Sequence, residues 1–255
     1  MKIGLLIPTT SNGRKWKKYH ETYLYNFTIK TLLLSLTKSE QEHDYIFYIG
    51  IDRGDKVYDN EETKNGFNKL KKVFNHIDFQ YLYMDIIAKG HLTVMWNRLY
   101  KKALDDECEY FYQCGDDIDF KTKGWVTNCI EILKKNNNIG FAGPINNNPN
   151  IITQSFVSRK HYELFGYFFP EEIINWCCDD WINEIYKKMN AFYPLINHLC
   201  LNIGGAERYT INNDPSFRLQ PNAIENLRRE CYKIVERDLN RSEGKNQLLK
   251  DNNIF

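Results

Sequence analysis

Short apolar runs alternate with amphipathic stretches along the first half of the chain. The apolar runs predict buried strands over residues 2–7, 45–51, 79–84 and 109–114. Helical spacing of apolar and aromatic residues predicts helices between them, over residues 16–27, 61–75 and 93–104. This alternation is typical of an α/β fold, in which a largely parallel sheet has helices on both faces.

The second half of the chain is less regular. The pattern predicts helices over residues 124–135 and 178–189, and strands over residues 139–142 and 151–157. A last helix is predicted after Pro221, followed by a frayed tail from Gly244. We therefore predict one mixed domain over residues 1–220, closed by a C-terminal helix and tail over residues 221–255.

Composition narrows the classes of partner. The 255 residues include 34 Lys and Arg against 33 Asp and Glu, so the net charge is +1. A near-neutral chain gives no global electrostatic reason to expect nucleic acid or an anionic membrane as partner. No apolar run approaches the roughly 20 residues that a membrane span needs. The seven cysteines form no Cys-x-x-Cys pair, which favours reduced thiols and a cytoplasmic location.

Polar residues cluster where three predicted strands end, over residues 9–12, 52–55 and 116–119. The carboxyl ends of parallel strands meet at one edge of a sheet, and ligands bind in the crevice beyond that edge. We therefore expect these three clusters to line one crevice.

The third cluster, Gly115-Asp116-Asp117-Ile118-Asp119, is the most informative stretch. Like charges this close raise one another's pKa unless a cation neutralises them. Carboxylate oxygens suit Mg²⁺ or Mn²⁺. If the backbone is extended, Asp117 and Asp119 share a face and Asp116 points away. The alternative is an acidic turn after a strand, but three carboxylates beside a glycine favour a divalent metal.

In the order of its parts, the chain resembles nucleotide-sugar-dependent glycosyltransferases of the GT-A fold, over about residues 3–210. Asp117-Ile118-Asp119 resembles the Asp-x-Asp element of that family. The supporting segments are Ile7-Pro8-Thr9-Thr10, Gly50-Ile51-Asp52, Lys89-Gly90 leading to Trp96-Asn97, and the acidic motif over residues 175–181. The resemblance implies a GT-A fold with a Rossmann-like, mostly parallel central sheet. It also implies a nucleotide-binding half over residues 1–120 and an acceptor half over residues 121–220.

The resemblance implies that Asp117 and Asp119 hold a Mn²⁺ or Mg²⁺ ion that bridges the donor's diphosphate. His198 stands where some members of the family have an additional metal ligand, although a histidine among apolar residues is more often a core side chain. Asp116 would contact the ribose, and Asp52 the base or ribose.

The rest of the nucleotide pocket would be lined by Thr9, Lys89, Gly90 and Asn97. Each of these residues also has a simpler interpretation. Asp52 is suited to starting a turn, Gly90 to a special backbone angle, and Asn97 to a solvated helix surface.

On the acceptor side, Asp179 and Asp180 begin a predicted helix, where adjacent residues diverge by about 100°. Only one of them is expected to face the crevice. The resemblance favours Asp180, with Asp179 close behind, as the base that accepts the acceptor's proton. The alternative is a helix cap. Trp176 and Trp181 are candidates either for a sugar platform or for the core, and Arg208-Tyr209 for a diphosphate contact.

The expected function is transfer of a sugar from a nucleoside diphosphate donor, UDP-sugar favoured, to a hydroxyl of a glycan, protein or lipid. The expected mechanism is metal-dependent and inverting. A sugar nucleotidyltransferase is the enzymatic alternative, but it needs a basic triphosphate loop, and residues 9–14 offer only Arg14. A non-catalytic carbohydrate-binding module is the other alternative, and it needs no metal.

Overall fold

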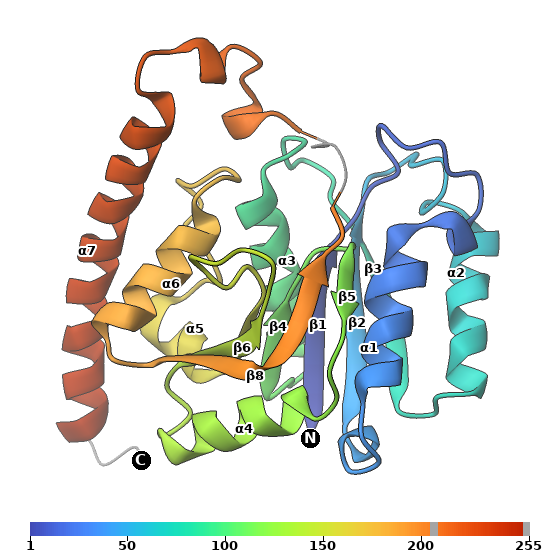
Figure 1. The fold of residues 1–255 in the computed structure, drawn as a ribbon, viewed down its shortest axis with the longest axis horizontal. Coiled ribbons are helices and arrows are strands. Elements are labelled where there is room, and N and C mark those ends of the chain that lie inside the picture. Colours follow the sequence, from blue (N-terminus) through green and yellow to red (C-terminus); the bar gives the residue numbers. More distant parts are fainter. Residues whose placement is uncertain (205–208, 252–255) are drawn as a thin grey trace.

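The fold is described by a computed structural model, for residues 1–204 and 209–251, with the backbone alone over residues 243–251. The described residues form an eight-stranded sheet in the order β3-β2-β1-β4-β7-β6-β8-β5 (Figure 1). The strands are β1 Lys2–Pro8, β2 Asp44–Ile51, β3 Ile77–Tyr83, β4 Tyr110–Gln113, β5 Ile118–Phe120, β6 Phe141–Ile145, β7 Ser155–Ser158 and β8 Phe192–Asn202.

The sheet has a parallel half and a mixed half. Strands β3, β2, β1 and β4 run parallel to one another, as in a Rossmann-like sheet. Strand β7 pairs antiparallel with β4 and β6, β8 pairs parallel with β6, and β5 pairs antiparallel with β8. The fold class predicted from the sequence, a mostly parallel α/β sheet flanked by helices, is confirmed.

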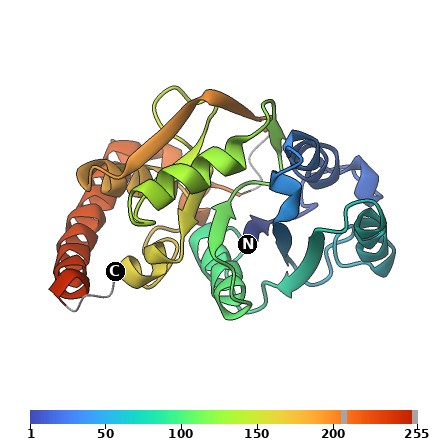
Figure 2. The same ribbon diagram turned by 90° about the horizontal axis from the view of Figure 1, so that it is seen from below.

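Helices cover both faces of the sheet (Figure 2). The α-helices are α1 Lys30–Ser35, α2 Glu61–Asn68, α3 Leu92–Asp105, α4 Trp125–Lys135, α5 Lys160–Phe165, α6 Cys178–Lys188 and α7 Ala223–Asp251. Short 3₁₀ turns occupy Tyr19–Glu21, Glu40–Glu42, Lys69–Lys72, Ile211–Asn213 and Phe217–Leu219, and a π-helix spans Leu24–Ile29.

Alternate residues of β1 face two separate cores, as the pleat of a strand requires. Leu5 is buried in the cluster that contains Phe67 and Trp125, on the side of α2 and α4. Its neighbour Leu6 is buried with Leu99, on the side of α3, α5 and α6. The sheet is therefore the middle of three layers, and its carboxyl edge is left free of the covering helices.

Three predicted elements differ from the structure. The aromatic stripe predicted from Trp16 to Phe27 is only half-buried, and its rings pack on one another. The core side is taken by aliphatic residues such as Leu24 and Ile29, because a π-helix changes the angular phase of the turn. Val73, in the predicted helix over residues 61–75, is 75% exposed, since a 3₁₀ turn has replaced the helix before it.

At the C-terminus, α7 continues to Asp251, so the frayed tail predicted from Gly244 is wrong up to that residue. Strands β5 and β8 were not predicted either. β5 has only three residues, and β8 is mostly half-exposed, without the alternation that reveals a strand.

Candidate functional site

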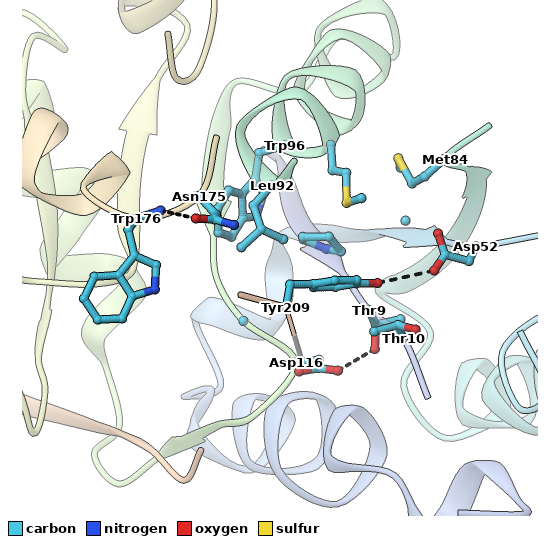
Figure 3. A pocket seen from close by; sticks show the side chains of 14 residues that line it. Thr9, Thr10, Asp52, Met84, Leu92, Trp96, Asp116, Asn175, Trp176 and Tyr209 are labelled. Carbon is cyan, nitrogen blue, oxygen red and sulfur yellow. Dashed lines mark hydrogen bonds between the residues drawn. The ribbon is translucent and has the colours of Figure 1, made fainter. Parts of the chain in front are cut away.

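A cavity of about 240 Å³ opens at the carboxyl edge of the parallel half (Figure 3). It lies where β1, β2 and β4 end, so the structure brings the three predicted polar clusters together. Its lining residues are Pro8, Thr9, Thr10, Gly50, Asp52, Met84, Leu92, Met95, Trp96, Gly115, Asp116, Asn175, Trp176 and Tyr209.

A buried hydrogen bond joins the ends of β1 and β4 inside the cavity. The Thr9 hydroxyl donates to Asp116 Oδ2 at 2.5 Å, and both side chains are buried. The backbone N–H of Thr9 donates to the Gly50 carbonyl at 2.8 Å, which adds the end of β2. The cavity floor is thus a rigid junction of three strands that places one carboxylate at its base.

Asp55 fixes the loop that follows β1. Its carboxylate accepts from the Ser11 N–H at 2.7 Å, the Ser11 hydroxyl at 2.8 Å, and the N–H groups of Val57 and Tyr58 at 2.9 Å. Burial acts to raise the pKa of Asp55, but these hydrogen bonds outweigh it and lower the pKa. The sequence analysis placed Asp55 in a polar cluster but gave it no role. The sequence feature that could have indicated this role is the group of turn-forming residues around Asp55.

Lys89 and Gly90 lie on the other side of the cavity mouth. Lys89 is exposed at the rim of an adjoining hollow that shares Thr10 and Asp52 with the cavity. Gly90 has φ +79, and a Cβ there would lie 2.8 Å from Cγ of Tyr209. A glycine is therefore required at position 90 both by the backbone angle and by the close approach of this ring.

Asp117 and Asp119 extend from the cavity edge along β5. Ile118 and Phe120 of this strand are buried in the core, so Asp119 lies on the opposite face of β5, whereas Asp117 lies in the turn before the strand. Asp119 forms an ion pair with Lys121. Asp117 folds back over the cavity wall, since a Cβ on Gly115 would lie 2.7 Å from its Oδ1.

His198 lies on β8 and does not line the cavity. Its Nε2 is 2.6 Å from the side-chain amide of Asn128 on α4. Among residues 1–204 and 209–251, no three His, Cys, Asp or Glu side chains are grouped so as to hold a metal ion. Of the predicted ligands, Asp117 lies beside Gly115 at the edge of the cavity, Asp119 pairs with Lys121, and His198 contacts Asn128.

Asn97 lies outside the cavity, at a loop that packs on α3. Its side-chain oxygen accepts from the N–H groups of Phe168 and Phe169, at 3.0 and 2.9 Å. Its amide donates to the Phe169 carbonyl at 2.8 Å. In this structure Asn97 therefore holds a loop rather than lining the predicted nucleotide pocket.

Replacing Asn97 with alanine is expected to lower the free energy of unfolding by about 1–3 kcal/mol, because two backbone N–H groups lose their acceptor. Thermal unfolding of Asn97→Ala beside Arg98→Ala, a substitution at a neighbouring exposed residue, measures this loss. An equal change in both variants would contradict the role of Asn97 in holding the loop.

The acceptor motif forms the wall opposite Asp52. Asn175 and Trp176 line the cavity, and α6 begins directly after them with Asp179 and Asp180 in its first turn. Trp181 is fully buried and donates its indole N–H to Asp238 of α7 at 3.1 Å. Of the two tryptophans, only Trp176 is thus available to a ligand.

The two carboxylates of this motif differ in environment. Burial first, and then the charge of Asp180, raise the pKa of Asp179 to about 7. Asp180 lies beside the thiol of Cys177, whose pKa is raised to about 12 by burial and then by the Asp180 charge. The protonation of Asp179 therefore changes near neutral pH.

Arg208 lies outside the described residues, whereas Tyr209 is described and enters the cavity. None of the described helices has both the length and the apolar run needed to cross a bilayer.

No protein-family model and no curated protein matches this sequence. Solved structures of S. aureus TarS are similar to it. TarS 1-349 in complex with UDP-GlcNAc has 13% identity and a TM-score of 0.48, over 82% of this chain and 60% of that one. A further TarS structure has 15% identity and a TM-score of 0.43, over 81% of this chain and 36% of that one. This chain thus spans less than two thirds of the TarS chains, and at this identity the likeness concerns the fold alone.

Proposed function

We propose that this protein transfers a sugar from a nucleoside diphosphate donor, UDP-sugar by preference, to a hydroxyl acceptor. The observation that carries the proposal is the cavity itself. One wall has carboxylates from two strand ends, Asp52 and Asp116, and the opposite wall is Asn175-Trp176, which leads into the helix of Asp179 and Asp180. Donor and acceptor groups therefore have separate walls of one cavity.

The wall that carries Asp52 and Asp116, here called the donor wall, suits a nucleotide. Apolar side chains surround a few polar groups, as is usual in small-molecule sites. Asp52 is placed to accept hydrogen bonds from a base N–H or a ribose hydroxyl. Thr9 and Asp116 lie deeper, and the carboxylates of Asp52 and Asp116 would need a cation once a diphosphate is bound beside them.

A divalent ion fits the carboxylates at this edge. Mg²⁺ is commonly held by one or two carboxylates together with substrate phosphates and water, so a preformed cluster of three ligands is not required. Asp116 in the cavity floor and Asp117 over Gly115 would hold Mn²⁺ or Mg²⁺. Asp119 and His198 would join only by leaving Lys121 and Asn128. When bound, the ion would offset the negative charge that grows on the departing diphosphate.

The wall formed by Asn175-Trp176 and the start of α6, here called the acceptor wall, supplies the catalytic base. The acceptor oxygen bonds to the anomeric carbon while the bond from that carbon to the diphosphate oxygen breaks, and the hydroxyl proton passes to a carboxylate. We assign this carboxylate to Asp179, because a group that titrates near pH 7 is best matched to the task. Direct displacement of this kind inverts the anomeric configuration.

The alternatives have less support. A nucleotidyltransferase needs cations at the loop after β1, and the Arg14 guanidinium there lies over the rings of Trp16 and Tyr23, at 5.8 and 5.3 Å from their centroids. A carbohydrate-binding module does not need the buried Thr9–Asp116 pair. The cytoplasmic location and the class of acceptor, glycan, protein or lipid, stay predictions.

Thermal unfolding with UDP, UDP-glucose and UDP-GlcNAc, each with and without MnCl₂, tests the proposal. A ligand at 100 times its dissociation constant stabilises the native state by about 2.7 kcal/mol, which raises the midpoint by roughly 5–10 °C for a chain of this size. We expect this shift, larger with Mn²⁺ present. No shift with any nucleotide would contradict the donor site.

A further inference from the structure

The ring of Tyr209 extends across the cavity toward Asp52 (Figure 3). Its hydroxyl donates to Asp52 Oδ2 at 3.4 Å. Below the ring in this view lie Thr9 and Asp116, joined by their own hydrogen bond. The carboxylate best placed to receive a nucleotide is therefore already engaged by a side chain of the same protein.

Asn175 holds the segment that carries this ring. Its amide donates to the carbonyls of Gly90 and Thr210, both at 3.1 Å. Its side-chain oxygen accepts from the N–H groups of Trp176 at 2.7 Å and Asn212 at 3.0 Å. One buried asparagine thus ties the Tyr209 segment to both walls of the cavity.

The volume of the cavity with Tyr209 in place is small for a site that binds a small molecule. With Tyr209 in place the volume is about 240 Å³. Sites that hold small molecules typically have roughly 300–1,000 Å³. A nucleoside diphosphate sugar is a large ligand on that scale, and the ring of Tyr209 occupies space beside Asp52 that such a donor would use.

We propose that Tyr209 competes with the nucleotide for Asp52 and thereby sets the affinity of the donor site. This inference rests on the proposed function, because it takes the cavity as the nucleotide site. The donor's base or ribose replaces the phenol hydroxyl at Asp52, and the ring leaves the space that the donor fills. The competition lowers the affinity for the nucleotide, because part of its binding free energy is used to displace Tyr209.

Titration calorimetry of UDP in the presence of MnCl₂ tests this competition with the full-length chain. Tyr209→Phe keeps the ring and removes the hydroxyl bond, so we expect UDP to bind about three- to tenfold more tightly than to the wild type. Tyr232→Phe removes the same atom from an exposed tyrosine on α7 and is the matched control. In the Asp52→Asn background the gain from Tyr209→Phe should shrink, because the two residues act on one hydrogen bond.

Unchanged or weaker UDP binding by Tyr209→Phe would overturn the proposal, since a ring that serves the nucleotide as a platform gives that result. If UDP binds to none of the variants, the proposed function fails, and hydrogen exchange decides on the contact itself. We then expect faster exchange of the amides of residues 209–213 in Tyr209→Phe than in Tyr232→Phe. Equal exchange would show that the hydroxyl does not hold this segment, and would overturn the proposal as well.

Discussion

Asp179→Asn is expected to lower the rate of sugar transfer by about 10²- to 10⁴-fold, the usual contribution of a positioned general base. The asparagine keeps the size of the side chain but cannot accept the acceptor's proton. The affinity for UDP should stay nearly unchanged, because Asp179 lies in the first turn of α6 and does not line the cavity. Single-turnover transfer rates and UDP titrations on the same variant measure the two effects separately.

The pH dependence follows from the same carboxylate. The pKa of Asp179 is raised to about 7, and the base is active when deprotonated. The rate should therefore rise with pH up to about 7 and then level off. The raised pKa also means that the folded state binds the proton more tightly than the unfolded state does. The free energy of unfolding therefore falls as the pH rises from about 4 to about 7, and the full loss is present above pH 7. Asp179→Asn should be more stable than the wild type at pH 8, and this difference should vanish in acid.

Asp180→Asn is the matched control, one residue further along the same turn. We expect it to retain most of the transfer activity. If Asp180→Asn abolishes transfer and Asp179→Asn does not, the base is Asp180, as the sequence resemblance favoured. A collapse of UDP affinity in either variant would instead assign that residue to the donor site or to the fold.

Asp117→Asn is expected to remove the dependence of nucleotide binding on Mn²⁺ and to lower transfer by about 10²-fold or more. The physical reason is that the carboxylate over Gly115 would lose its charge, and the diphosphate would leave without its counter-ion. UDP titrations with and without MnCl₂ measure the metal effect directly, with no need for an acceptor.

Asp119→Asn separates the contribution of Asp119, on β5, from that of Asp117. Asp119 is paired with Lys121, so its loss should affect Mn²⁺ binding much less than the loss of Asp117. Equal effects of the two substitutions would mean that Asp119 leaves Lys121 and binds the ion, as the Asp-x-Asp resemblance implies. A wild-type response of Asp117→Asn to Mn²⁺ would contradict a metal at this edge.

The sequence predicts the parallel half of the fold and the position of the cavity well. Apolar runs that end in Thr9, Asp52 and Asp116 are local signals, and the carboxyl ends of parallel strands must meet. These three side chains indeed converge on one cavity. Their placement follows from the parallel direction of β1, β2 and β4, which the alternation of strands and helices predicts.

Hydrogen-bond partners that come from distant segments of the chain could not be predicted from local sequence patterns. Asn97 receives its partners from Phe168 and Phe169, and His198 receives its partner from Asn128. No spacing in the sequence brings these segments together, because the antiparallel pairing of β5 with β8 and the packing of one loop on α3 decide them. The central role of Asn175 has the same origin, since its four hydrogen bonds reach three separate parts of the chain.

The long last helix has a consequence for how far the protein can be shortened. The indole of Trp181, which directly follows the Asp179-Asp180 pair, is anchored to Asp238, a side chain only 1% exposed on α7. Ending the chain at residue 220, where the sequence pattern divides it, would strip this anchor from the acidic turn and expose the buried tryptophan. A shortened protein that keeps this anchor therefore has to retain the C-terminal helix at least through Asp238.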